Sequence, residues 1–103
     1  VYNSYAVNRR QRCVFTPTNT AAPGAGGVAF VGGFGYQDWP CWVFVLSGKG
    51  GGEAGAHEIG PTVGLGHPGR TTPNEGYFAG HGDWAPIMGV GYYEPITQWS
   101  KGE

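Results

Sequence analysis

Glycine is the residue that most constrains what this chain can fold into. It supplies 21 of the 103 residues, and eight prolines accompany it. Glycine weakens helices and proline breaks them, so such a chain is poor in helix and rich in turns and irregular strands. Aromatic residues make up 15% of the sequence, whereas disordered segments are depleted in them. We therefore expect one small, loop-rich domain over residues 1–103, with aromatic packing.

The charge balance argues against two classes of partner. The formal net charge is −1 and only 13% of the residues are charged. A protein that binds nucleic acid through phosphates needs a basic excess, and the single basic cluster, "NRRQR" at 8–12, is expected to be a solvated segment. No apolar run approaches the roughly 20 residues that a membrane span requires. We expect neither nucleic acid nor a membrane span to be part of the function.

Strand signals are concentrated in the region 26–47, and residues 1–25 are left without an assignment. The segment 13–27 begins like a short strand and then dissolves into turn residues. "GVAFVGGF" at 27–34 is a β-prone run bounded by glycines. "CWVFVLS" at 41–47 is the strongest strand candidate, and its continuous apolar and β-branched residues predict burial on both faces.

One segment has the composition of a helix. Residues 53–64 contain alanine, glutamate and isoleucine, and Gly64 is a natural stop signal. The preceding "GKGGG" at 48–52 reads as a flexible connector. Residues 65–103 are rich in glycine, proline and aromatics, and we expect them to form loops.

The predicted helix carries most of a zinc-binding motif, H-E-x-x-H-x-x-G-x-x-H. His57, Glu58, Gly64 and His67 stand at four of its positions, but Pro61 replaces the middle histidine. In the complete motif, two histidines one helical turn apart hold zinc, and the glutamate polarises the metal-bound water. The glycine lets the chain leave the helix sharply, so that the third histidine returns to the metal.

Three segments together resemble the metzincins, the zinc metalloproteases that carry a methionine-containing turn. "AHEIGPTVGLGH" at 56–67 is followed by "GHGDWAPIMGVGYY" at 80–93 and by "QWSKGE" at 98–103. The pattern is most similar to that of secreted reprolysin-like peptidases of microbial type, and residues 54–103 follow it almost continuously. The resemblance implies a secreted α+β domain with a few strands, one active-site helix and long loops.

The resemblance assigns roles by position. It makes His57 and His67 the first and third zinc ligands, Glu58 the general base, and Met88 the residue of the turn beneath the metal. Peptides or proteins are the implied substrates, and residues 65–103 become the third-ligand loop and Met-turn. "GGVAFVGGF" at 26–34 is the candidate for the edge strand that aligns the substrate.

Other positions are assigned less directly. His81, in "GHGDW", matches a recurrent histidine of the family, and we expect it to support the site by a hydrogen bond rather than to bind metal. The cysteines, Cys13 and Cys41, are either a disulfide or two buried free thiols. The extracellular setting that the resemblance implies favours the disulfide, which would close a loop of about 29 residues and contribute roughly 3 kcal/mol.

Two departures from the family pattern affect the site directly. Pro61 offers no nitrogen to a metal, and within a helix it removes one hydrogen bond at a cost of about 3 kcal/mol. Pro68 replaces the usual acidic residue after the third histidine. The family domain also has a longer N-terminal part with a supporting helix, so the resemblance implies an N-terminally truncated domain.

Three interpretations follow. The chain is a zinc-dependent endopeptidase-like domain that is catalytically impaired, with zinc bound weakly or not at all. Alternatively, it is a non-catalytic binding or self-assembling protein built on the same scaffold, for which exposed sheet edges would suit self-association. In the third, the enzyme is active and Pro61 and Pro68 are misread positions. Zinc content separates the first and third interpretations from the second.

Overall fold

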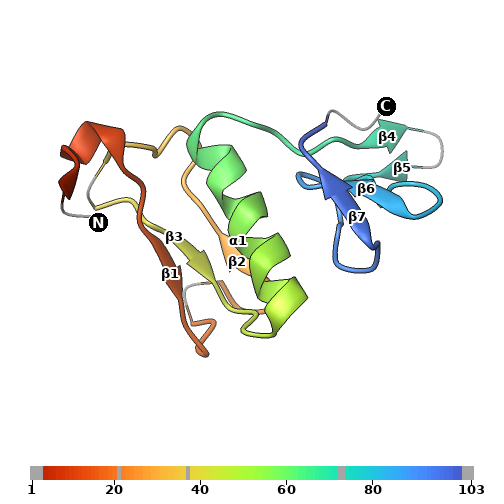
Figure 1. The fold of residues 1–103 in the computed structure, drawn as a ribbon, viewed down its shortest axis with the longest axis horizontal. Coiled ribbons are helices and arrows are strands. Elements are labelled where there is room, and N and C mark those ends of the chain that lie inside the picture. Colours follow the sequence, from red (N-terminus) through yellow and green to blue (C-terminus); the bar gives the residue numbers. More distant parts are fainter. Residues whose placement is uncertain (1–3, 21, 37, 72–73, 101–103) are drawn as a thin grey trace. The chain divides into compact units, whose positions relative to one another are not determined.

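The computed structural model describes residues 4–20, 22–36, 38–71 and 74–100. Contacts between Cα atoms group the chain into two compact units, residues 1–64 and 65–103. Its described part contains one α-helix and several short strands in small sheets, so the expected α+β class is confirmed (Figure 1).

The first unit contains a three-stranded sheet and the helix. A 3-10 turn, η2 (Val7–Arg9), precedes β1 (Cys13–Phe15), β2 (Gly27–Val28) and β3 (Cys41–Val43), and helix α1 spans Gly48–Thr62. The strands lie in the order β1-β3-β2, with β1 parallel and β2 antiparallel to β3. Strand β3 is therefore central, as its apolar composition predicts. It ends at Val43, however, so the predicted strand 41–47 was too long.

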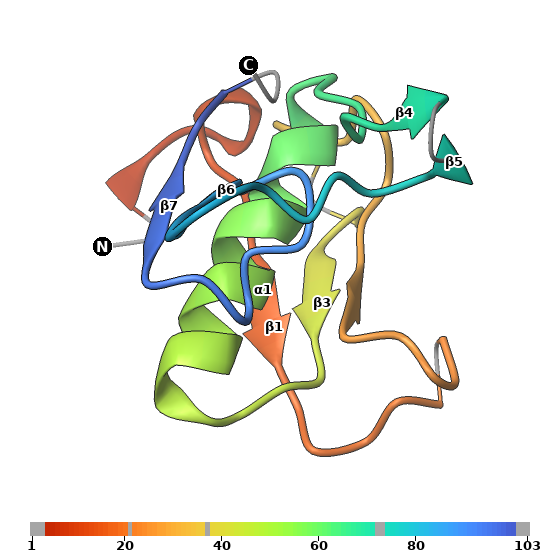
Figure 2. The same ribbon diagram turned by 90° about the vertical axis from the view of Figure 1, so that its right-hand side faces the viewer.

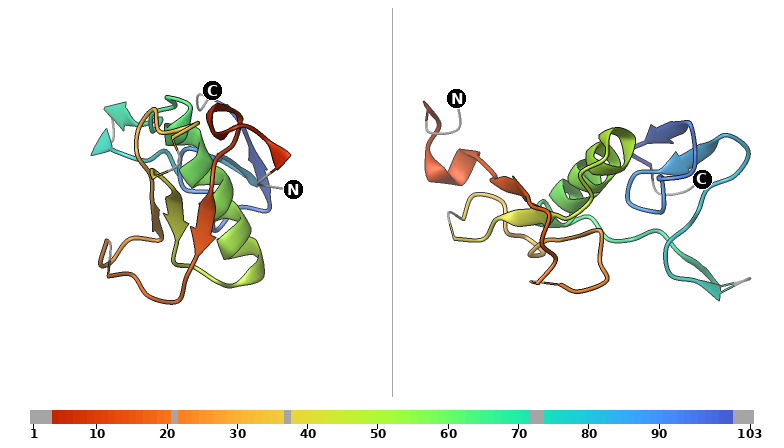
Figure 3. Two further views of the ribbon diagram at one scale, coloured as in Figure 1. Left: turned by 90° about the vertical axis from the view of Figure 1, so that its left-hand side faces the viewer. Right: turned by 90° about the horizontal axis from the view of Figure 1, so that it is seen from below.

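Helix α1 covers one face of this sheet (Figure 3). Residues two apart in a strand point to the same face, so Cys13 and Phe15 share a face with their register partners, Cys41 and Val43. Phe15 reaches the helix, since a Cβ atom built on Gly55 would lie 3.0 Å from its ring. Cys41 and Val43 are fully buried on this side of the sheet.

The helix begins five residues earlier than its composition predicts. Six of the fifteen residues in α1 are glycine, and "GKGGG" at 48–52 forms its first turn instead of a flexible connector. Each interior glycine weakens a helix by about 0.5–1 kcal/mol relative to alanine, so this turn depends on its surroundings. A Cβ atom at Gly51 would lie 2.9 Å from the carbonyl oxygen of Val45, which shows how closely the preceding chain approaches. No helix in the described part of the chain is long and apolar enough to cross a membrane.

The residues after β2 leave the sheet and bind the end of the helix. The backbone N–H of Gly32 donates to the carbonyl of Pro61 at 2.8 Å, and that of Phe34 donates to Thr62 at 3.0 Å. The bond from Phe34 satisfies the Thr62 carbonyl at the end of the helix, and the bond from Gly32 adds a second donor to the Pro61 carbonyl, which also accepts from Gly64. The predicted β-run 27–34 is therefore wrong beyond Val28, because its second half pairs with helix α1 and not with a strand.

The second unit contains two small sheets where only loops were expected. Strands β4 (Arg70–Thr71) and β5 (Asn74–Glu75) pair antiparallel, and β6 (Trp84–Pro86) and β7 (Ile96–Gln98) pair in parallel (Figure 2). The prediction missed these strands because they are only two or three residues long. Exposed side chains also support them, since Arg70 pairs with Glu75 at 2.6 Å and the Trp84 indole donates to Gln98 at 2.9 Å.

Two glycines of α1 provide a matched test of the packing. Gly52→Ala should stabilise the protein by about 0.5–1 kcal/mol, because a Cβ there meets no atom within 4 Å and alanine favours helix. Gly51→Ala should destabilise it by about 1–3 kcal/mol, the usual cost of overpacking, because its Cβ would collide with the Val45 carbonyl. Urea unfolding of both variants measures the two effects.

Equal stabilisation by both substitutions would show that the first turn of α1 does not pack as described.

Candidate functional site

The inner face of α1 places Glu58 against the sheet. One face of the helix carries Gly51, Ala54, Gly55 and Glu58, because positions 54 and 55 lie three or four residues from both 51 and 58. Glycine and alanine at 51, 54 and 55 let the helix approach the sheet closely, and Ala54 is 1% exposed. Gly27 of β2 completes the fit, because a Cβ atom there would lie 2.8 Å from Oε1 of Glu58. A side chain at position 27 would thus displace the carboxyl group.

Burial gives Glu58 an unusual acidity. Desolvation disfavours the charged carboxylate and raises the pKa of Glu58 from its ordinary 4.5 to about 7. A carboxyl group with a pKa near neutral pH can both accept and return a proton there, which is what a general base in catalysis requires. This is the strongest chemical feature among the predicted site residues.

His57 and Pro61 lie on the same helix. His57 is half-buried, and as the residue before Glu58 it points about 100° away from it around the helix axis. Pro61 is buried in the last helical turn, where α1 continues through it to Thr62. The helix then ends, because Gly64 has a φ of +88° and its N–H donates to the Pro61 carbonyl at 2.9 Å. The predicted end at 64 is therefore two residues late.

His67 and Met88 line one cavity of the second unit. Its volume is about 530 Å³, and its walls are formed by Leu65, Gly66, His67, Pro68, Met88, Trp99 and Ser100. Met88 is 3% exposed and lies in a tight turn that the 2.9 Å hydrogen bond from Gly89 N–H to the Pro86 carbonyl closes. The His67 ring packs on Tyr77, with their centroids 4.1 Å apart. Sequence analysis had singled out His67 and Met88 but not Tyr77 or Trp99.

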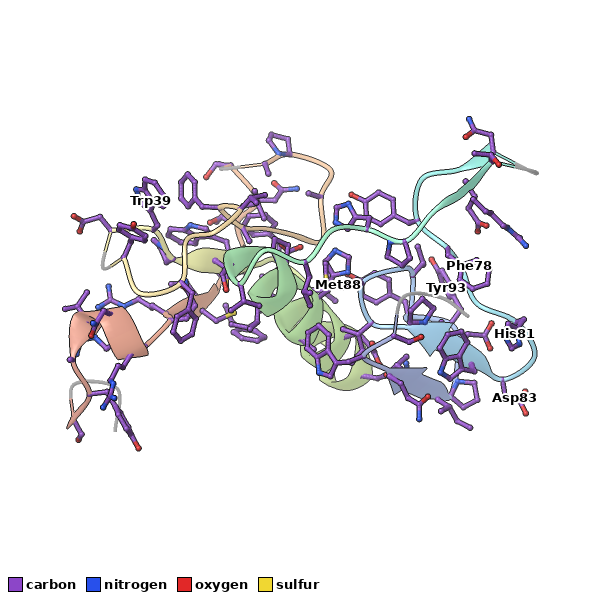
Figure 4. All side chains as sticks on the ribbon, turned by 90° about the horizontal axis from the view of Figure 1, so that it is seen from above. Trp39, Phe78, His81, Asp83, Met88 and Tyr93 are labelled. Atoms are coloured by element: carbon purple, nitrogen blue, oxygen red, sulfur yellow. The ribbon has the colours of Figure 1, made fainter. Side chains whose placement is uncertain are left out.

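His81 does not line this cavity. It is exposed, its backbone pairs with Trp84, and its ring lies 5.2 Å from the indole of that residue. Figure 4 shows it beside Asp83, well apart from Met88. His81 thus lies in a tight turn with an aromatic contact, and its expected hydrogen bond to the site stays a prediction.

Catalytic zinc takes three protein ligands. Within the described ranges, no group of three His, Cys, Asp or Glu residues suited to a metal occurs. Position 61, which should supply the middle ligand, presents a buried proline ring.

The two cysteines lie close together. Cys13 and Cys41 are free thiols in this structure, and the expected disulfide between them stays a prediction. They are nevertheless register partners in β1 and β3, and the ladder of these strands already holds them together without a covalent bond. The Cys41 N–H, for example, donates to the Arg12 carbonyl at 3.0 Å. Sequence spacing indicated a pair but not that both residues would start adjoining strands.

Comparison with known proteins finds no match to this chain among protein-family models, curated proteins or solved structures.

The acidity of Glu58 predicts a pH dependence of stability. The folded protein binds this proton more tightly than the unfolded chain, so the stabilisation is fully present below about pH 4.5 and is lost as the pH rises through about 7. Glu58→Gln keeps the shape of the side chain without the charge, and it should flatten this decline and be the more stable protein at pH 8. Denaturant unfolding at pH values between about 4 and 8, which span the ordinary and the raised pKa of Glu58, measures this decline in stability.

Glu53→Gln is the matched control, since Glu53 lies on the same helix and pairs with Lys49 at 3.2 Å. If the stability of the wild type and of Glu58→Gln changed with pH in the same way, the Glu58 carboxyl would not be desolvated as described.

Proposed function

We propose that this chain is a secreted, metzincin-like zinc endopeptidase domain whose metal site is impaired. The observation that carries the proposal is the cavity shared by His67 and Met88. In the resembled family a methionine in a tight turn lies beneath the metal that the third histidine binds. Here the matching methionine is buried in such a turn, and the matching histidine lines the same cavity.

The geometry of α1 gives further support. The helix carries the His57-Glu58 pair in its second half, and Gly64, two residues after its end, has a positive φ, as the motif requires. Glu58, with its pKa of about 7, has the acidity expected of a residue that takes a proton from an attacking water. Pro61 is what separates this helix from that of a working peptidase, since it offers no ligand atom.

In this proposal, a peptide substrate binds beside β2. In the described sheet β2 pairs with β3 on one side only, so its other edge is available for an added strand. Next to this edge lies an apolar cavity of about 270 Å³, lined by Val28, Ala29, Phe30, Pro40 and Trp42. An extended peptide paired with β2 could place an apolar side chain in this cavity. We therefore propose Gly27–Val28 as the part of the predicted edge strand, 26–34, that pairs with a peptide.

One observation favours the alternative, a binding or self-associating protein without catalysis. The ring of Trp39 packs against Phe30 and Tyr36, with centroid distances of 5.3 and 4.9 Å, yet all three side chains are exposed. Aromatic side chains that stack at a surface are typical of interaction sites. Such a surface would serve substrate binding in the first proposal and binding alone in the second.

Pro61 provides the decisive test. The wild type should bind zinc weakly and cleave peptides poorly or not at all. Pro61→His should tighten zinc binding by at least about tenfold, which corresponds to roughly 1.4 kcal/mol, because it adds an imidazole one turn after His57. Competition with a chromophoric chelator measures the affinity. Pro61→Ala is the matched control, since it restores the backbone N–H without a ligand.

Equal zinc affinity of the histidine and alanine variants would refute the assignment of position 61. Stoichiometric zinc and robust peptidase activity in the wild type, with proline at 61 verified by mass spectrometry of the tryptic peptide 50–70, would refute the impairment.

A further inference from the structure

The two thiols face each other across neighbouring strands, at a separation that a disulfide can bridge. Cys13 and Cys41 stand directly opposite each other in the parallel ladder of β1 and β3. Adjacent strands lie about 4.8 Å apart, within the Cα separation of about 4.4–6.8 Å that a disulfide bridges. Register partners point to the same face of the sheet, so both sulfurs leave it toward α1.

The two thiols differ in their access to solvent. Cys41 belongs to the central strand and is completely buried, and its Sγ also lies 3.6 Å from the carbonyl oxygen of Arg12. Cys13 belongs to β1, which lies at the edge of the described sheet, and is only partly buried. A reagent in solution therefore meets Cys13 first, while Cys41 is accessible only to Cys13.

The pKa values of the two thiols differ as well, and the more accessible thiol has the lower pKa. A hydrogen bond from the Cys41 thiol lowers the pKa of Cys13 below its ordinary value, against the opposing effects of burial and of the Glu58 charge. The same hydrogen bond raises the pKa of Cys41, and burial raises it further. The thiolate is the nucleophile in disulfide exchange, so the more accessible sulfur is also the more reactive one.

We propose that Cys13 and Cys41 form a redox site that exchanges with small-molecule disulfides, with Cys13 as the attacking thiol and Cys41 as the resolving thiol. The Cys13 thiol loses its proton to solvent, and its thiolate attacks a disulfide RSSR and expels RS⁻, which takes up a proton from solvent; a mixed disulfide remains on Cys13. The Cys41 sulfur then attacks Sγ of Cys13 and expels the second RS⁻, which takes up the Cys41 proton. Two protein thiols and RSSR thus give one protein disulfide and two RSH.

Oxidation would link the edge strand β1 covalently to the central strand β3. Strand β1 is held to β3 by a short ladder and by the bond from Thr16 N–H to the Val43 carbonyl at 2.9 Å. A covalent bond at the first register pair removes the freedom of β1 to separate there. This inference does not depend on zinc binding or on peptidase activity, so the two proposals can fail independently.

The wild type itself gives the first test, with oxidised glutathione as the probe. The reduced full-length protein should lose both thiols and retain no glutathione, as intact mass spectrometry after alkylation would show. In brief alkylation of the reduced native protein, Cys13 should react at least about tenfold faster than Cys41. Both cysteines lie in one tryptic peptide, 13–49, so chymotryptic digestion is needed to separate them.

Two variants form a matched pair for the assignment of roles. Cys41→Ala should stop at the mixed disulfide and retain one glutathione on Cys13. Cys13→Ala should leave the buried Cys41 unmodified in the native protein, although the thiol should react once denaturant is added. Circular dichroism checks that each variant is folded. If a variant is unfolded, the relative alkylation rates of Cys13 and Cys41 in the wild type decide the assignment of roles.

Wild-type thiols that survive an excess of oxidised glutathione would overturn the proposal. Faster alkylation of Cys41 than of Cys13, or an equal uptake of glutathione by the two variants, would overturn the assigned roles.

Discussion

The close approach of helix α1 to the sheet of the first unit is the contact on which the rest of that unit depends. It is possible because the inner face of the helix carries Gly51, Ala54 and Gly55, so that the Phe15 ring and the Val45 carbonyl can come within contact distance of its backbone. Larger side chains there would hold the helix away from the strands. The approach buries Glu58 and encloses Cys13 and Cys41 beneath the helix. Desolvation by this approach raises the pKa of Glu58. The hydrogen bond between the two thiols lowers the pKa of Cys13 and raises that of Cys41, and burial raises the pKa of Cys41 further.

Sequence patterns predicted the features whose signals are local. The helix around His57 and Glu58 and the buried strand that starts at Cys41 follow from residue types over short windows, whereas the α+β class was implied by the family resemblance. Gly64 indicated the turn after the helix, although the helix itself ends at Thr62. The position of Met88 in a tight turn followed from a resemblance rather than from any propensity, and the hydrogen bond at Gly89 closes that turn.

Features that depend on distant parts of the chain could not be predicted in this way. The segment 48–52 has the composition of a linker, and only its packing against the chain around Val45 makes it helical. The segment 27–34 has the composition of one strand, but its second half binds the carbonyls of Pro61 and Thr62. The sequence suggested that Cys13 and Cys41 pair, whereas their placement at the same level of adjoining parallel strands is a property of the sheet.

The hydrogen bonds from Gly32 and Phe34 to the end of α1 also connect the two parts of the site in the first unit. The edge strand β2 and the helical position 61 are more than thirty residues apart in sequence, yet only a few residues of chain separate Val28 from the atoms that bind the Pro61 carbonyl. A peptide that displaced this loop would pull on the last helical turn. Conversely, a residue at 61 that altered the direction of its carbonyl would shift the loop beside the free edge of β2, where we propose that a peptide binds. The residue at 61 therefore affects the position of the loop beside β2 as well as the ligand atoms that the helix provides.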